Sequence, residues 1–133
     1  MEHGMEQLFR ALGDKTRLRL LNLMSGQEVC VCYFIEILGL PQSTISRHLA
    51  YMRRAGLVLA RREGKWMHYR LAVPKSPALQ AILREVSNGL AADKEMERDR
   101  AKLNRACCAP QKFVRLENAP RPVTAPEVSG VRS

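Results

Sequence analysis

The chain has 133 residues, a formal net charge of +9 and 46% hydrophobic residues. This length suits one domain with a tail, and the basic charge favours a polyanionic partner, most commonly nucleic acid. The sequence lacks the run of about 18 apolar residues that a membrane helix needs, and its N-terminus has no apolar signal segment. We therefore expect a cytoplasmic protein without a membrane partner, whose four cysteines are reduced thiols.

The first half of the chain predicts short helices. Asp14 is a favourable N-cap, Gly39 and Gly56 are favourable stops, and a short extended segment is expected at 27–29. Apolar residues recur at helical spacing in four segments, which cover residues 5–12, 15–24, 32–38 and 42–55.

The second half predicts a hairpin, one long helix and a tail. "LVLARR" and "WMHYRL" flank the turn "EGK", and Ser76-Pro77 opens a helix that the charged stretch "DKEMERDRAK" prolongs. Four of the seven prolines lie in residues 109–133, which have no apolar period. We expect a DNA-binding and dimerisation domain over residues 1–108 and a disordered tail over 109–133.

The helix that begins at Gln42 has two distinct faces. Ile45, Leu49 and Met52 are spaced to face the core, and the opposite side carries small, amide and guanidinium groups that suit a major groove. Between residues 37 and 62 there are five arginines and no acidic residue. We therefore expect a winged helix-turn-helix fold, mainly α with a β-hairpin wing. We do not expect an enzyme.

Contacts to DNA are expected from this helix and from the wing tip "RREGK". For His48, packing or hydrogen bonding inside the protein is an equal alternative. The expected contact residues are Gln42, Ser43, Thr44, Ser46, Arg47, His48, Arg53, Arg54, Arg61, Arg62 and Lys65.

The motifs "ALGDKTRLRLLNLM", "EVCVC", "LPQSTISRHLAYMRRAGLV" and "REGKWMHYRL" resemble those of the ArsR/SmtB family of metal-responsive repressors, and most of all its arsenic-responsive members. The resemblance covers about residues 5 to 90. It implies a homodimer that binds palindromic double-stranded operator DNA and leaves it when an inducer binds. It departs from the subgroup at Tyr33 and Phe34, at Pro41, and at Ile35, which occupies the place of a third cysteine.

Cys30 and Cys32 are the candidate ligands of the inducer. Thiolates are soft ligands that suit arsenite or antimonite, and no resident cofactor is expected. Residues two apart point in different directions on a helix but to one side of an extended segment, so chelation should keep the start of the helix non-helical. The alternative role is that of small buried apolar residues.

The third ligand is open. Cys107 or Cys108 could supply it, from the same or the other subunit; these two could form a separate site; or the local pair could suffice. The alternative functions are a cadmium or lead sensor and a thiol redox-responsive regulator. A zinc site is disfavoured, because none of the three histidines, His3, His48 and His68, lies in the last helix. The resemblance places the ligands of zinc-sensing family members in that helix.

Overall fold

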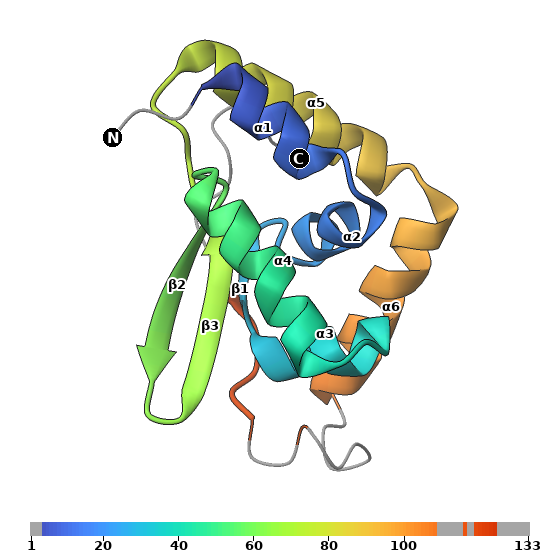
Figure 1. The fold of residues 1–133 in the computed structure, drawn as a ribbon. Coiled ribbons are helices and arrows are strands. Elements are labelled where there is room, and N and C mark those ends of the chain that lie inside the picture. The colour runs from blue at the N-terminus through green and yellow to red at the C-terminus, as the bar shows by residue number, and fades with distance from the viewer. Residues whose placement is uncertain (1–3, 109–115, 117–118, 125–133) are drawn as a thin grey trace.

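Six helices and four strands follow one another in the part of the chain that the computed structural model describes, residues 4–108, 116 and 119–124 (Figure 1). In chain order they are α1 (Met5–Leu12), α2 (Lys15–Leu23), β1 (Gln27–Cys30), α3 (Val31–Leu38), α4 (Gln42–Arg54), β2 (Val58–Glu63), β3 (Trp66–Leu71), α5 (Pro77–Ala91), α6 (Lys94–Cys108) and β4 (Val123–Thr124). The predicted class, mainly α with a hairpin wing, is confirmed. No helix among these residues is long and apolar enough to cross a membrane.

The predicted helix boundaries rest on identifiable caps. The Asp14 carboxylate accepts a hydrogen bond from the Arg17 backbone N–H at 3.1 Å and caps α2. Gly39 ends α3 with φ at +68°, a left-handed conformation that favours glycine, and its N–H donates to the Ile35 carbonyl at 3.0 Å. This glycine makes the tight connection from α3 to α4.

The strands form an antiparallel sheet in the order β2-β3-β1-β4. Glu63 pairs with Trp66, which leaves Gly64 and Lys65 as a two-residue turn, one residue shorter than the predicted turn. Gly64 has φ at +60°, as such a turn requires. Figure 1 shows this hairpin, the wing, projecting away from the helices.

The predicted apolar face of α4 is confirmed, because Ile45, Leu49 and Met52 are fully buried. They pack in a single core with residues of α2, β1 and α3. The core therefore fixes the inner face of α4 and turns its opposite face to solvent.

The prediction of one long last helix is wrong. The helix is interrupted between α5 and α6 (Figure 1). At this point the Asp93 carboxylate accepts a hydrogen bond from the Met96 backbone N–H at 3.0 Å. The break lets α6 turn back against α2 and α3 and bury Met96, Leu103 and Ala106 in its own apolar stripe. The charged stretch thus has a buried face, because an N-cap and new apolar contacts outweigh continuation of α5.

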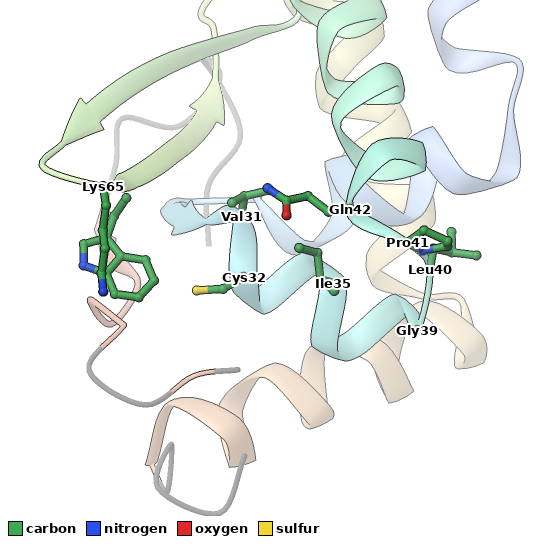
Figure 2. A pocket seen from close by; sticks show the side chains of 9 residues that line it. Val31, Cys32, Ile35, Gly39, Leu40, Pro41, Gln42 and Lys65 are labelled. Atoms are coloured by element: carbon green, nitrogen blue, oxygen red, sulfur yellow. The ribbon is translucent and has the colours of Figure 1, made fainter. Parts of the chain in front are cut away.

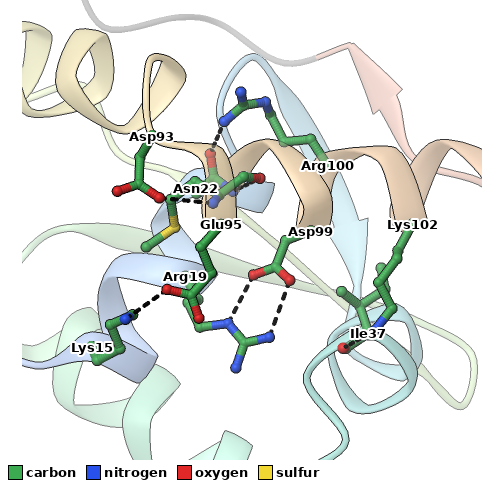
Figure 3. A network of polar contacts seen from close by, with 10 residues as sticks. Lys15, Arg19, Asn22, Ile37, Asp93, Glu95, Asp99, Arg100 and Lys102 are labelled. Carbon is green, nitrogen blue, oxygen red and sulfur yellow. Dashed lines mark hydrogen bonds and ion pairs between the residues drawn. The ribbon is translucent and has the colours of Figure 1, made fainter.

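Polar contacts hold α6 against α2 (Figure 3). The Arg19 guanidinium donates two hydrogen bonds to the buried Asp99 carboxylate, at 2.8 and 3.1 Å, and this partner raises the pKa of Arg19. The Asn22 side chain donates to the Met96 carbonyl at 3.0 Å. This two-pronged ion pair, buried at Asp99 and partly exposed at Arg19, joins α6 to α2.

The segment after α6 is described only in part. Val123 and Thr124 form β4, which pairs with β1, and Leu116 is fully buried. The edge of β1 thus pairs with Val123 and Thr124, a contact that no local sequence pattern reveals. Residues 109–115, 117–118 and 125–133, where the rest of the predicted tail falls, lie outside the described residues.

Candidate DNA-binding surface and thiol site

The outer face of α4 carries most of the predicted DNA contacts. Thr44 is half-buried. The exposed residues are Gln42, Ser43, Ser46, Arg47, Ala50, Arg53 and Arg54. Their short and basic side chains leave the helix backbone accessible along one face, which is what approach to a major groove requires.

Arg17 ties α4 to the first two helices. Its guanidinium donates to the carbonyls of Ala11 and Arg10, at 2.8 and 3.1 Å, and so satisfies the C-terminal end of α1. The same group lies 4.3 Å from the centre of the Tyr51 ring on α4. The sequence analysis did not identify this role, because three separate elements meet there.

His48 points into the protein rather than along the outer face of α4. Its Nδ1 lies 3.2 Å from Arg17 Nη1 and 3.8 Å from Asp14 Oδ2, and its side chain is 19% exposed. This arrangement favours the hydrogen-bonding alternative for His48 over a contact to DNA.

The three basic residues of the wing have different surroundings. Arg61 donates to both oxygens of Glu28 on β1, at 2.7 to 3.2 Å, and this guanidinium lowers the pKa of Glu28. Arg62 and Lys65 are exposed at the tip, where Lys65 Nζ lies 5.0 Å from the centre of the Trp66 ring. The tip therefore offers two accessible cations, and Arg61 links the wing to β1.

Cys30 and Cys32 lie together at the junction of β1 and α3. Cys30 is the last residue of β1 and has extended backbone angles, φ −69° and ψ 143°, while Cys32 lies in the first turn of α3. Their sulfur atoms are 3.1 Å apart and both residues are buried. Since metal–thiolate bonds are about 2.3 Å long for a comparable soft ion, one ion can reach both sulfurs. The predicted conflict with helix geometry is thus resolved without unwinding α3.

The two thiols differ in acidity. A hydrogen bond from the Cys32 S–H stabilises the Cys30 thiolate and lowers the pKa of Cys30 to about 7, against the effect of burial. The same hydrogen bond, together with burial, raises the pKa of Cys32. With its pKa at about 7, Cys30 is the thiol of the pair that ionises more easily near neutral pH.

The other two cysteines are not part of this pair. Cys107 lies half-buried on α6, and its S–H donates to the Asn104 carbonyl at 3.3 Å. Cys108 ends α6, and its side chain lies outside the described residues. Within the described part of the chain no three His, Cys, Asp or Glu side chains are close enough to hold one metal ion.

The sequence analysis missed the roles of two buried side chains beside the thiols, the imidazole of His68 and the carboxylate of Glu28. His68 pairs with Cys30 across the sheet, and its Nε2 lies 2.9 Å from Glu63 Oε1. The carboxylate of Glu28, two residues before Cys30, accepts a hydrogen bond from the Arg61 guanidinium. Only the strand register reveals these contacts, so no local pattern could have indicated them.

Sequence comparison identifies known relatives. The profile described as "Bacterial regulatory protein, arsR family" matches residues 14–59. An arsenical resistance operon repressor of Escherichia coli is 50% identical over 76 residues, which are 56% of this chain and 64% of that protein. The arsenic resistance transcriptional regulator ArsR2 of Pseudomonas putida is 41% identical over 90 residues, or 63% of this chain and 77% of that protein.

The match thus spans less than two thirds of the Escherichia coli relative. Solved structures agree on the fold. HlyU of Vibrio cholerae, in its reduced form, is 32% identical with a TM-score of 0.56 and covers 66% of this chain and 88% of its own. A possible transcriptional regulator for arsenical resistance is also 32% identical, with a TM-score of 0.50, and covers 71% of this chain and 93% of its own.

Proposed function

Because the chain belongs to the ArsR family of bacterial regulatory proteins, we propose that it is a transcriptional repressor released from DNA by arsenite or antimonite. It binds double-stranded operator DNA as a homodimer, with α4 in the major groove and the wing on the backbone. Three of the similar proteins described above have names that refer to resistance to arsenic, which supports this proposal.

The observation that carries the proposal is the thiol pair at the entrance to the helix-turn-helix. Cys30 and Cys32 are buried, with sulfurs 3.1 Å apart, and one of them ionises near neutral pH. This donor set fits trivalent arsenic or antimony, because each sulfur replaces one hydroxyl of the acid. The hydroxyl that Cys32 displaces leaves as water with the Cys32 thiol proton, and the hydroxyl that the Cys30 thiolate displaces leaves as water with a proton from solvent.

The path from the thiols to DNA is short. Cys32 belongs to α3, which is the first helix of the helix-turn-helix, and α3 leads through Gly39 and Pro41 into α4. Bonds from both sulfurs to one atom draw the end of β1 and the first turn of α3 together. A difference of about 1–3 kcal/mol between the two conformations is typical of such coupling, and about 1.4 kcal/mol lowers affinity tenfold.

For the third ligand we propose Cys107 or Cys108, from the same or the partner subunit. Cys107 is half-buried on α6 and packs against the core that contains Cys30 and Cys32. Replacing Cys107 and Cys108 by Ser tests this, and arsenite-driven release that stays unchanged would rule it out.

The function is tested with DNA selected from random duplexes by the purified chain. Fluorescence anisotropy measures the affinity for that duplex with and without arsenite, in the wild type and in Cys30→Ser and Cys32→Ser. We expect arsenite to weaken binding at least tenfold in the wild type only. If arsenite has no effect on the wild type, the proposal is wrong.

The same assay separates the alternatives. Release by cadmium or lead but not by arsenite indicates a sensor of divalent soft metals. Release by peroxide alone, reversed by a dithiol, indicates a redox-responsive regulator.

A further inference from the structure

A cleft of about 450 Å³ lies between the outer face of α4 and strand β3 of the wing. It is separate from the cavity over Cys32, which Trp66 also lines and which belongs to the proposed inducer site (Figure 2). The two spaces share no lining residue. The residues that line the α4–β3 cleft are Ser46, Ala50, Arg53, Arg54 and Tyr69.

One wall of the α4–β3 cleft is a single stripe of α4. Its four residues are exposed and follow one another at helical spacing: Ser46, Ala50, Arg53 and Arg54. The short side chain of Ala50 leaves room between the Ser46 hydroxyl and the two guanidinium groups. A ligand in the cleft can therefore come close to the helix and still reach all three polar groups.

Tyr69 forms the opposite wall. It lies in β3, where it pairs with Val29 of β1 on one side and with Ala60 of β2 on the other. The residue is half-buried and packs against the core, and it also lines the cleft. A tyrosine in such a position buries its apolar ring and turns its hydroxyl toward the open side. The hydroxyl then faces the α4 stripe across the cleft.

The chemistry of the cleft suits an anion. Its polar side chains carry two guanidinium ions and two hydroxyls, all of which can donate hydrogen bonds, and no acidic residue lines it. Within the described part of the chain, the side chains of Ser46, Arg53 and Tyr69 have no hydrogen bond or ion pair. Adjacent guanidinium ions repel each other, and an anion between them removes that repulsion. A phosphate supplies both the charge and several acceptor oxygens.

From this arrangement we propose that the cleft binds one phosphate of the DNA backbone, and that Tyr69 is a DNA contact in each protomer. This rests on the proposed function and assigns a further residue to it. A helix in the major groove has a phosphate backbone on each side, and the wing lies beside α4 on one of these sides. The strand between them passes the cleft. A phosphate contact fixes the position of α4 and reads no base.

The first test removes only the hydroxyl. Tyr69→Phe keeps the ring that packs against the core, and it should bind the selected duplex about tenfold more weakly for each protomer bound. Its salt dependence should equal that of the wild type, because an uncharged hydroxyl displaces no counterion. Arg53→Gln, an exposed change on the opposite wall, should lower the affinity and also reduce the salt slope by about 1 for each protomer.

Tyr51→Phe is the matched control. Tyr51 lies on α4 but outside the cleft, where its ring packs against the Arg17 guanidinium, and the substitution keeps that ring. Its affinity for the duplex should stay within about twofold of the wild type, which is the expected result for an exposed site without a contact.

The second test locates the phosphate. Duplexes in which one phosphate at a time is replaced by a neutral methylphosphonate are titrated with the wild type, Tyr69→Phe and Arg53→Gln, and fluorescence anisotropy gives each affinity. At one phosphate in each half of the duplex, the replacement should weaken the wild type at least about threefold more than it weakens Tyr69→Phe. Arg53→Gln should show its coupling at the same phosphate. At the remaining phosphates Tyr69→Phe and the wild type should lose affinity equally.

An affinity of Tyr69→Phe equal to that of the wild type, or a loss that is coupled to no phosphate, overturns the proposal. A changed base preference in Tyr69→Phe overturns it as well, because a phosphate contact reads no sequence. In these cases arsenite-driven release of the wild type would still support the repressor. If the wild type selects no duplex, the proposed function fails and this proposal fails with it.

Discussion

One hydrogen bond decides which of the two adjacent thiols reacts first. The Cys32 S–H donates to Cys30, so the buried Cys30 sulfur carries the negative charge and the Cys32 sulfur, at the cavity, carries the proton. Because the thiolate is the attacking form, Cys30 should react with the ligand before Cys32 does.

The acidity of Cys30 can be measured directly. In Cys107→Ser/Cys108→Ser protein, thiolate absorbance should show one thiolate formed per chain with a midpoint at about pH 7. Adding Cys32→Ala removes the hydrogen bond and should move the midpoint toward the ordinary value of 9.0. A midpoint that Cys32→Ala leaves in place would contradict this account.

The pH dependence of arsenite binding has the same origin. The rate of binding should rise as the pH increases through about 7, because the thiolate is the attacking form. The Cys30 pKa is lower in the folded state, so its contribution to stability is complete above pH 9.0 and disappears as the pH falls through about 7. Stopped-flow fluorescence of Trp66 measures the rate, and a rate independent of pH between 6 and 8 would exclude this order of attack.

Glu28 stabilises the sheet through its ion pair with Arg61. Glu28→Gln should lower the free energy of unfolding by about 1 kcal/mol, because the pair is partly exposed at Arg61. Arg61 lowers the pKa of Glu28 from 4.5, so this stability is present above that pH and disappears as the pH falls through the lower folded value. Urea unfolding at pH 7 and pH 3 measures it; an equal difference at both would argue against an ion pair.

Among the helices and strands, α4 carries the proposed base contacts on its solvent-exposed face. Arg47→Ala removes an exposed guanidinium from the middle of that face and should weaken binding to the selected DNA by about 1–3 kcal/mol if Arg47 reads a base. Arg98→Ala, an exposed arginine on α6, is the matched control and should change affinity by less than twofold. Equal losses in both variants would show a general effect of charge instead.

The position of α6 depends on a buried carboxylate. Asp99→Asn cannot accept both hydrogen bonds from Arg19 and should lower the free energy of unfolding by about 2 kcal/mol. Glu97→Gln, an exposed change two residues away on the same helix, should cost little. Thermal unfolding of the two variants compares them, and similar midpoints would mean that the pair contributes nothing net.

These elements also differ in how far the sequence predicts them. The apolar stripe of α4 and the alternation of the hairpin are local patterns, and both were predicted. The break between α5 and α6 was missed although Asp93 is a good N-cap, because helical residues continue on both sides of it. The pairing of β4 with β1 joins residues nearly a hundred positions apart, so no local pattern contains it.

The candidate site divides in the same way. Cys30 and Cys32 were found from their spacing, and the structure adds the extended backbone that lets them meet. The contacts of Arg61 with Glu28 and of His48 with Arg17 depend on tertiary packing, so no local sequence pattern indicates them.

For the whole molecule, the net charge of +9 predicts binding to DNA that is strongly sensitive to salt. The logarithm of affinity should fall linearly with the logarithm of salt concentration, with a slope of about −0.9 for each phosphate contact. Arg62→Ala at the wing tip should reduce the slope by about 1 for each protomer bound and leave sequence preference unchanged. An altered base preference would mean that Arg62 reads bases.

The junction of β1 and α3 has a consequence for the history of such regulators. Both sulfurs come from residues two positions apart, and their proximity needs only the end of a strand and the start of a helix. Under the proposed function, one substitution at either position abolishes the response to the inducer and leaves the DNA-binding surface of α4 and the wing unchanged. A lineage of such regulators could then change its signal by single mutations and keep the DNA sites that it already binds.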